Sequence, residues 1–186
     1  MENDIEKLKF PIGKYKAILE FNFSRTVEDI KTLESFADKL RDSVKGLDKT
    51  DFKKTYRKGG MNIAQIIHHY CDTHTYAFLR TKHTLLEDNP SVKMYEVSEF
   101  LTTPESNVLD VEDSLKVIEG IHAKWVSLLK TLSQDDFNKT YYHSARDKNI
   151  ILHEHVGMYA WHTKHHLVHI GMAKESIKEK GKRSKQ

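Results

Sequence analysis

The sequence predicts an all-α protein whose core is a bundle of four amphipathic helices. Charged residues make up 31% of the 186 residues and hydrophobic residues 38%, a balance that suits helices with one solvated face. Only three prolines and eight glycines interrupt the chain, and apolar residues recur at helical spacing in four segments. A chain of this length can bury one hydrophobic core, so we expect a single domain over residues 1–176.

The N-terminal part of the sequence predicts an arm followed by the first helix. Residues up to about Asn22 show no clear hydrophobic period, so we expect an extended arm that lies on the core. The first helix is expected to begin after Thr26, with Asp29 as the partner in its cap, and Gly46 provides a stop. Its apolar stripe consists of Ile30, Leu33, Phe36, Leu40 and Val44.

The second predicted helix has a well-marked N-terminus. Asn62 is a suitable cap and Gln65, three residues later, completes a capping box, while Pro90 limits the other end. Residues 91–109 then form a long loop between the second and third helices. A loop of this length exceeds ordinary connections and indicates a functional loop or a crossover between helix pairs.

The C-terminal half predicts two more helices. The third begins near Asp110 and continues through Leu132. Residues 137–151 show no period and predict irregular structure, and the fourth helix covers about residues 152–176. Residues 177–186 form a basic tail that we expect to be disordered.

Charge and cysteine content limit the partners and the location of the protein. The net charge of +3 comes from the C-terminus, because residues 174–186 carry +4 and the remainder −1. We therefore expect no nucleic-acid partner. No apolar run approaches the roughly 20 residues of a membrane span, and the N-terminus lacks the pattern of a secretory signal. Cys71 is the single cysteine, so we expect a cytoplasmic protein without an internal disulfide and without membrane contact.

Histidines on the fourth predicted helix are the first candidates for chemistry. His162 and His166 are spaced to lie on one helical face, in a stripe that also contains Tyr159, His169 and Ala173. Burying several imidazoles costs free energy unless their nitrogens find partners. A divalent metal ion would provide one, and a partly solvated groove lined by hydrogen-bonding histidines is the alternative. The residues alone leave both interpretations open.

A third ligand would have to come from another helix, and the second helix carries the other group of histidines. Periodicity places His74 in the centre of its apolar stripe and His69 on the flank, and it does not decide which of them faces the fourth helix. The remaining histidines considered are expected to be surface or packing residues: His83, His122, His143, His153 and His155.

Four segments carry a family resemblance. They are FPIGKY at 10–15, GGMNIAQIIHHYCDTH at 59–74, YYH at 141–143 and YAWHTKHHLVHI at 159–170. Together and in this order they resemble the DinB superfamily, and most closely its YfiT branch, over roughly residues 9–173. Tyr70 and Cys71 depart from the pattern of that branch.

The resemblance implies a four-helix bundle that holds one divalent metal ion through three histidines. The family's ligands match His69, His162 and His166 of this sequence. His165 and His169 are candidate neighbours of these ligands, in positions to orient them or to line a pocket.

Two residues outside this histidine set also have expected roles. Arg57, in the loop before the second helix, is a candidate to receive a substrate carboxylate. Cys71 is expected to be a small packing residue.

The resemblance also implies an activity. The YfiT branch is described as metal-dependent hydrolases, and relatives act as bacillithiol S-transferases. Three imidazoles leave a divalent ion with an open coordination position, where the pKa of a bound water or thiol falls. Zinc and nickel are the leading ions, and iron and manganese are less specific candidates. The resemblance also implies a small-molecule substrate, such as a low-molecular-weight thiol, and a homodimer. A metal-binding stress-response module without turnover, or a helical interaction protein, is the alternative.

Overall fold

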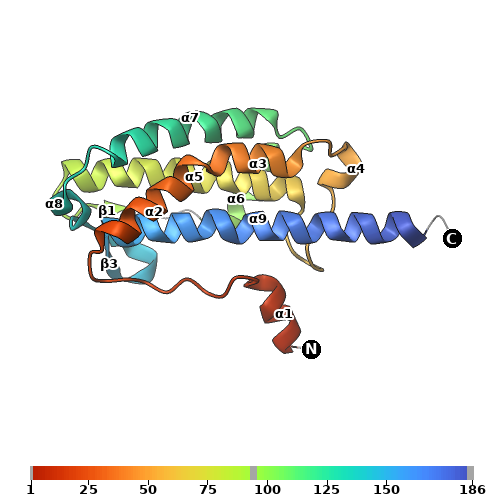
Figure 1. Ribbon diagram of the computed structural model, residues 1–186, viewed down its shortest axis with the longest axis horizontal. Coiled ribbons are helices and arrows are strands. Elements are labelled where there is room, and N and C mark those ends of the chain that lie inside the picture. Colours follow the sequence, from red (N-terminus) through yellow and green to blue (C-terminus); the bar gives the residue numbers. More distant parts are fainter. Residues whose placement is uncertain (1, 93–95, 184–186) are drawn as a thin grey trace.

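The computed structural model of the protein describes residues 2–92 and 96–183, and most of these residues are helical (Figure 1). The bundle has four helical segments, and the first of them consists of two consecutive helices. This confirms the predicted four-helix bundle. The bundle helices are α2 (Phe23–Glu34) with α3 (Phe36–Val44), α5 (Ile63–Leu86), α7 (Glu112–Leu129) and α9 (Leu152–Arg183).

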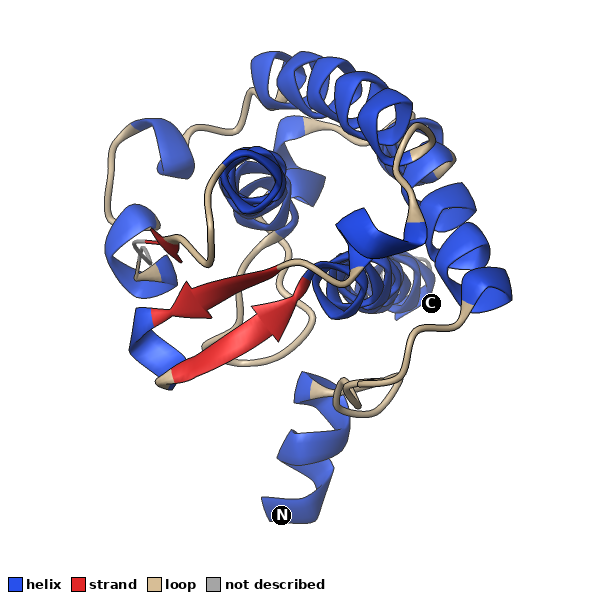
Figure 2. Cartoon of the chain, turned by 90° about the vertical axis from the view of Figure 1, so that its left-hand side faces the viewer, coloured by secondary structure: helices blue, strands red, loops and turns tan. Residues whose placement is uncertain are grey.

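Short elements connect the bundle helices. β1, β2 and β3 form a small sheet at one side of the bundle (Figure 2), with β1 parallel to β2 and β2 antiparallel to β3. The short elements are α1 (Glu2–Lys9), α4 (Lys49–Phe52), β1 (Ser91–Val92), α6 (Val97–Phe100), η1 (Glu105–Asn107), α8 (Gln134–Phe137), β2 (Thr140–His143), η2 (Ser144–Arg146) and β3 (Lys148–Ile151).

The packing of α5 against α9 brings the two histidine-bearing helices together. They run antiparallel and side by side along the bundle (Figure 1), and α5 also packs against α7. None of the helices in the described parts of the chain has the length and apolar character to cross a lipid bilayer.

The first bundle helix differs from the prediction at its start. Its N-cap is Asn22, whose side-chain oxygen accepts from the Arg25 amide at 2.9 Å. The helix therefore begins four residues earlier than predicted, after Asn22 and not after Thr26. Asp29 is not a capping residue. It is buried, and its carboxylate is paired with the Arg25 guanidinium at 3.1 Å.

The same helix is also interrupted, where the sequence predicts one continuous segment. Ser35 separates α2 from α3, and its hydroxyl donates to the carbonyls of Lys31 at 3.2 Å and Thr32 at 3.4 Å. Serine hydroxyls that bond back to the preceding turn compete with the helical ladder and bend helices. The apolar stripe conceals this break because it keeps its period across Ser35.

The second predicted helix is confirmed in detail as α5. The Asn62 side chain accepts from the Gln65 amide at 2.8 Å, and the Gln65 side chain accepts from the Asn62 amide at 3.1 Å. This reciprocal pair is a capping box. It fixes where the helix starts and therefore which face of α5 carries His69.

Three segments predicted to lack regular structure contain some. The long loop over residues 91–109 contains β1, α6 and η1. The N-terminal arm is extended only over residues 10–22, because residues 2–9 form α1. Residues 137–151 contain the β2–β3 hairpin, in which alternate residues of β2 are buried. Strands of four residues are too short for alternation to stand out in the sequence, and Asp147 turns the chain with a φ of 48°.

The fourth helix is longer than predicted. α9 continues to Arg183, seven residues past the expected end at residue 176. The last part of the predicted tail, residues 184–186, lies outside the described residues. The domain boundary at residue 176 stays a prediction.

Two apolar clusters fill the bundle, and a layer of aromatic and histidine rings lies where they meet. His74 is fully buried and stacks on Phe36 of the first cluster, with ring centroids 5.3 Å apart. It also lies edge-on to Trp125 of the second cluster at 6.3 Å. The core therefore contains polar rings at its centre, and each needs a hydrogen-bond partner.

His155 shows how such a ring is accommodated away from the candidate site. It is fully buried on α9. Its Nδ1 lies 2.9 Å from the Tyr141 hydroxyl and its Nε2 lies 3.2 Å from the Ala77 carbonyl oxygen. Burial, and then the charge of Arg80, lowers the pKa of His155 from 6.5 to about 3. The ring is therefore neutral in the folded protein.

This pKa predicts a loss of stability in acid. The unfolded chain takes up a proton on His155 below about pH 6.5, whereas the folded protein does not until about pH 3, so the free energy of unfolding falls across that interval. For His155→Gln we expect the fall between pH 7.5 and pH 5.0 to be smaller by about 1–2 kcal/mol. Urea unfolding at the two pH values measures this, and an identical fall in both proteins would contradict the assignment.

Candidate metal centre

Two turns of α9 and one turn of α5 supply the candidate ligands. His162 and His166 are four residues apart on α9, so their side chains lie on one face. His69 faces them from α5, and its ring centroid lies 5.1 Å from that of His162 and 5.0 Å from that of His166. The three histidines that the resemblance selected therefore lie together.

The distances between the ring nitrogens suit a shared cation. The Nε2 atoms of His69 and His162 lie 3.1 Å apart, and the ligand nitrogens of His69, His162 and His166 all lie within 4.8 Å of one another. Two nitrogens bound to one tetrahedral zinc ion at ordinary distances are separated by about 3.3 Å. The donor set and its spacing therefore fit one divalent ion that is bound by three imidazoles.

Burial keeps these rings in the form that binds a metal. Burial, and then the charge of His165, lowers the pKa of His69 from 6.5 to about 4. Burial is also the largest cause that lowers the pKa of His162 and of His166 well below the usual value, with neighbouring histidines adding to it. Neutral imidazoles have a free lone pair, and a protonated ring would have to lose its proton before it could bind an ion.

The neighbouring histidines of α5 point elsewhere. The Nδ1 of His68 lies 2.8 Å from the Ser114 hydroxyl and its Nε2 lies 3.1 Å from the Val108 carbonyl oxygen, so this ring faces α7 and η1. His74 lies deeper, with Nε2 at 3.1 Å from the Nδ1 of His162. The structure thus gives His69 and His74 different positions. His69 lies beside both α9 histidines and next to the Nε2 of His162, whereas His74 contacts the opposite nitrogen of His162, Nδ1.

The other two histidines predicted near the ligands also lie on α9: His165 directly precedes His166, and His169 lies on the following turn. The Nδ1 of His169 lies 3.1 Å from the Nδ1 of His166, and Tyr56 stacks on the His169 ring with centroids 3.8 Å apart. His165 stacks on Trp161 at 4.4 Å. His165, His166 and His169 also have ring nitrogens within 4.8 Å of one another.

Two arginines lie near the histidines. Arg57 lies over the Tyr56 ring at 5.3 Å, its Nη1 donates to the Lys58 carbonyl at 3.0 Å, and its buried Nε has no partner in the described part of the chain. Arg80 is buried on α5 and donates to the Tyr159 hydroxyl at 3.3 Å, while its Nε and Nη2 have no partner there either. An uncompensated guanidinium favours an anionic group.

The sequence did not reveal the contacts of Arg80 and of His122. His122 was expected to be a surface or packing residue, and it is indeed packed in the core, but its Nε2 also lies 2.7 Å from the Nδ1 of His74. The same expectation is right for His83, which is exposed and pairs with Glu87. The available signal was position: His122 falls one residue after Ile121 in the apolar stripe of the third predicted helix, and Arg80 shares a helical stripe with His69.

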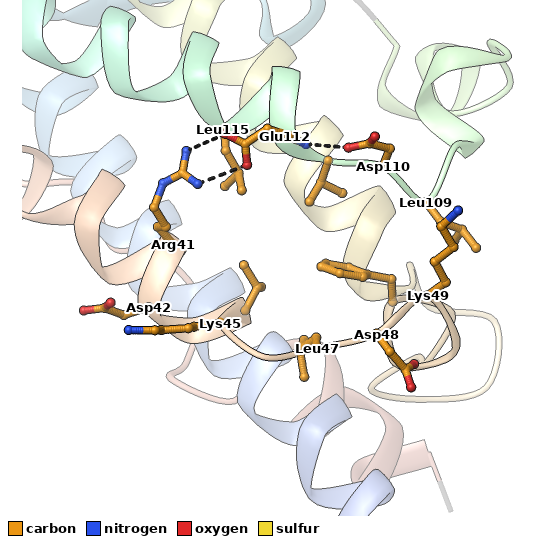
Figure 3. Close-up of a pocket in the computed structure, with 13 residues that line it drawn as sticks. Arg41, Asp42, Lys45, Leu47, Asp48, Lys49, Leu109, Asp110, Glu112 and Leu115 are labelled. Carbon is orange, nitrogen blue, oxygen red and sulfur yellow. Dashed lines mark hydrogen bonds and ion pairs between the residues drawn. The ribbon is translucent and has the colours of Figure 1, made fainter.

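A cleft of about 790 Å³ lies apart from this centre, between α3, α4 and the start of α7 (Figure 3). Its lining includes Arg41, Phe52 and Leu115, and the Arg41 guanidinium pairs with Glu112 at 3.1 Å on one side. No histidine of the candidate centre lines it.

Cys71 is not part of the centre either. It is partly buried, packs against the first apolar cluster, and has a thiol pKa raised by burial. Burial thus disfavours the thiolate that a nucleophilic cysteine would need.

Comparison with known families identifies the chain. The DinB superfamily model matches residues 32–170, which include every candidate ligand. The chain belongs to the DinB superfamily. This confirms the resemblance found in the sequence.

Individual proteins are similar to this DinB protein over most of its length. A protein of Oceanobacillus iheyensis is 36% identical over 162 residues, which cover 87% of this chain and 93% of the relative. One of Geobacillus thermodenitrificans is 35% identical over 166 residues, covering 89% and 93%. Each carries the name "Putative metal-dependent hydrolase".

A solved structure is also similar to this DinB protein. YfiT from Bacillus subtilis matches with a TM-score of 0.89 and 29% identity, covering 92% of this chain and 98% of YfiT. It is described as "a probable metal-dependent hydrolase with an unusual four-helix bundle topology". The relatives thus carry metal-dependent names, and this chain has a histidine cluster that could hold a metal ion.

Proposed function

We propose that this protein is an enzyme that binds one divalent metal ion through His69, His162 and His166. The ion would activate a low-molecular-weight thiol of the bacillithiol type, or water. The observation that supports this most strongly is the convergence of three neutral imidazoles from α5 and α9, with ring nitrogens within 4.8 Å of one another. A three-histidine set leaves an open coordination position, which distinguishes catalytic sites from closed structural ones.

A bound divalent ion would lower the pKa of a water or thiol at that open position. Imidazole donors alone suit zinc and nickel, so we propose one of these as the native ion. The chain's own contribution is to hold three neutral donors in place and to surround them with buried aromatic rings, such as Tyr70, whose centroid lies 5.5 Å from that of His162.

The surroundings of the histidines support a thiol as the nucleophile, whereas the names of the relatives support water. The hydrogen-bond partners of the three histidines include no carboxylate in the described part of the chain. A thiol ionises much more readily than water, so a site without an adjacent carboxylate base favours thiol transfer. The names of the relatives support hydrolysis.

The guanidiniums of Arg57 and Arg80, each with at least one buried nitrogen that lacks a partner in the described residues, suggest what the substrates carry. Arg80 is connected to the centre through Tyr159, whose ring lies 5.9 Å from that of His162. Arg57 reaches it through Tyr56, which stacks on His169. We propose that one of them binds a carboxylate or another anionic group of the thiol or its acceptor.

Other expectations stay predictions. They are a cytoplasmic location, a homodimer, and the absence of nucleic-acid and membrane partners. The alternative function, a metal-binding stress-response module without turnover, shares the same metal centre and differs only in activity.

Metal binding tests the centre directly. We expect the purified protein to bind about one equivalent of zinc or nickel, measured by elemental analysis and calorimetric titration. His162→Ala should weaken binding on the order of 100-fold or more, because a ligand is lost. His83→Ala, which changes an exposed histidine of α5, is the matched control and should bind normally. Full occupancy in His162→Ala would refute the centre.

Activity separates the proposed functions. The zinc-loaded and nickel-loaded proteins should accelerate the reaction of bacillithiol or cysteine with monobromobimane, and the metal-free protein should not. Hydrolysis of p-nitrophenyl esters, measured without thiol, tests the other nucleophile. Arg80→Gln should raise KM for an acidic thiol more than for its uncharged ester. Metal binding without either reaction would favour the non-catalytic alternative.

A further inference from the structure

A row of buried imidazoles continues from His162 into the core. The Nδ1 of His162 lies 3.1 Å from the Nε2 of His74. The Nδ1 of His74 lies 2.7 Å from the Nε2 of His122, and the Nδ1 of His122 lies 2.8 Å from the Leu33 carbonyl oxygen. The row therefore joins α9, α5, α7 and α2, and it ends on a backbone group.

That last group sets the direction of every hydrogen bond in the row. A carbonyl oxygen only accepts, so the Nδ1 of His122 carries the hydrogen, and its Nε2 in a neutral ring is an acceptor. The Nδ1 of His74 must then donate to it, which makes the Nε2 of His74 an acceptor. His162 must therefore donate through Nδ1. Its Nε2, the atom that faces His69, is left with a free lone pair.

A second, shorter row leads to the same result at His166. The Nε2 of His169 lies 3.0 Å from the Leu8 carbonyl oxygen and must donate to it. The Nδ1 of His169 is then an acceptor, and the Nδ1 of His166 at 3.1 Å donates to it. The Nε2 of His166 is thereby left with its lone pair free.

Both carbonyls that end the rows lie in the last turn of a helix. Leu8 is the penultimate residue of α1 and Leu33 the penultimate residue of α2. Carbonyls in the last turn have no partner further along their own helix, so they are available to a side chain. The negative end of the helix dipole strengthens their role as acceptors.

We propose that His74, His122 and His169 are positioning residues that fix the tautomers and ring orientations of His162 and His166, so that both ligands present the Nε2 lone pair to the metal. This inference rests on the proposed function of the same centre. Partners of this kind orient metal-binding histidines in many proteins, where they are commonly carboxylates or carbonyls. Here neutral rings stand between the ligands and the carbonyls.

This arrangement has two chemical consequences. Neutral partners add no negative charge next to the ligands, so an ion held by these histidines would acidify a bound group more strongly than an ion whose ligands are hydrogen-bonded to carboxylates. The second row also uses the facing nitrogens of His166 and His169 for a hydrogen bond. The cluster of His165, His166 and His169 is then not a second metal site, and one ion is expected in total.

Tautomers are measurable without metal or activity. Long-range ¹H–¹⁵N correlation spectra of protein containing ¹⁵N-histidine, recorded metal-free at neutral pH, show which ring nitrogen is protonated. We expect Nδ1–H at His122, His74, His162 and His166, and Nε2–H at His169. Addition of zinc should leave His162 and His166 in the same tautomers. A predominant Nε2–H tautomer at His162 or His166 in the metal-free protein would overturn the proposal.

Variants of His122 test whether the row acts on the metal. His122→Phe removes both hydrogen bonds and should weaken zinc binding by about 10- to 100-fold, although His122 is two rings away from the ion. His122→Gln keeps an amide oxygen to accept from His74 and an amide N–H to donate to Leu33, so it should recover most of that loss. Circular dichroism should first show that both variants are folded. If His122 had only a structural role, the two folded variants would then have similar zinc affinities.

His155→Gln provides the matched control, because it changes an equally buried histidine of α9 that belongs to neither row. It should bind zinc as the unaltered protein does. Equal zinc affinity of His122→Phe and the unaltered protein would overturn the positioning role. If the unaltered protein binds no metal at all, the proposed function fails. The tautomers of the metal-free protein still decide the positioning role in that case, and also if His122→Phe does not fold.

Discussion

The burial of imidazole rings between α5 and α9 is the constraint on which the rest of the structure depends. A neutral imidazole has one donor and one acceptor nitrogen, so a row of such rings is satisfied only when all its hydrogen bonds run in one direction. The rows from His162 and His166 meet this condition by ending on carbonyl oxygens. The acceptor nitrogen that remains on His162 lies 3.1 Å from the Nε2 of His69. A cation bound between the three rings would take a lone pair from each of them.

The chemistry that this centre suits follows from its charge. Burial holds His69, His162 and His166 neutral, and neither row ends on a carboxylate. An ion held there would retain its full charge in a site of low polarity, where electrostatic effects are strong. The guanidiniums of Arg57 and Arg80, which have nitrogens without a partner in the described part of the chain, add positive charge nearby. Together these features support the proposed anionic substrate and ionised nucleophile.

The sequence predicts the parts of this structure that depend on local signals. The capping box of Asn62 and Gln65 marks the start of α5, and the helical periods locate α5, α7 and α9. The β2–β3 hairpin is too short to produce a period. His69 could be chosen over His74 only through the family resemblance, because both are compatible with the stripe of α5. The contact of His74 with His122 joins two helices, and no local pattern records it.

The break between α2 and α3 at Ser35, which the sequence did not predict, also explains why His122 can bond to α2. In one continuous helix, as the stripe from Ile30 to Val44 predicts, the Leu33 carbonyl would accept from the amide four residues later. Ending α2 at Glu34 places that carbonyl in a last turn, where the His122 ring can donate to it at 2.8 Å. Pro11 acts similarly beyond α1, since it has no N–H to donate to the Lys7 carbonyl and the helix ends at Lys9. The irregularities of the fold thus supply the acceptors that orient the candidate ligands, so the metal centre depends on where helices stop as much as on where histidines lie.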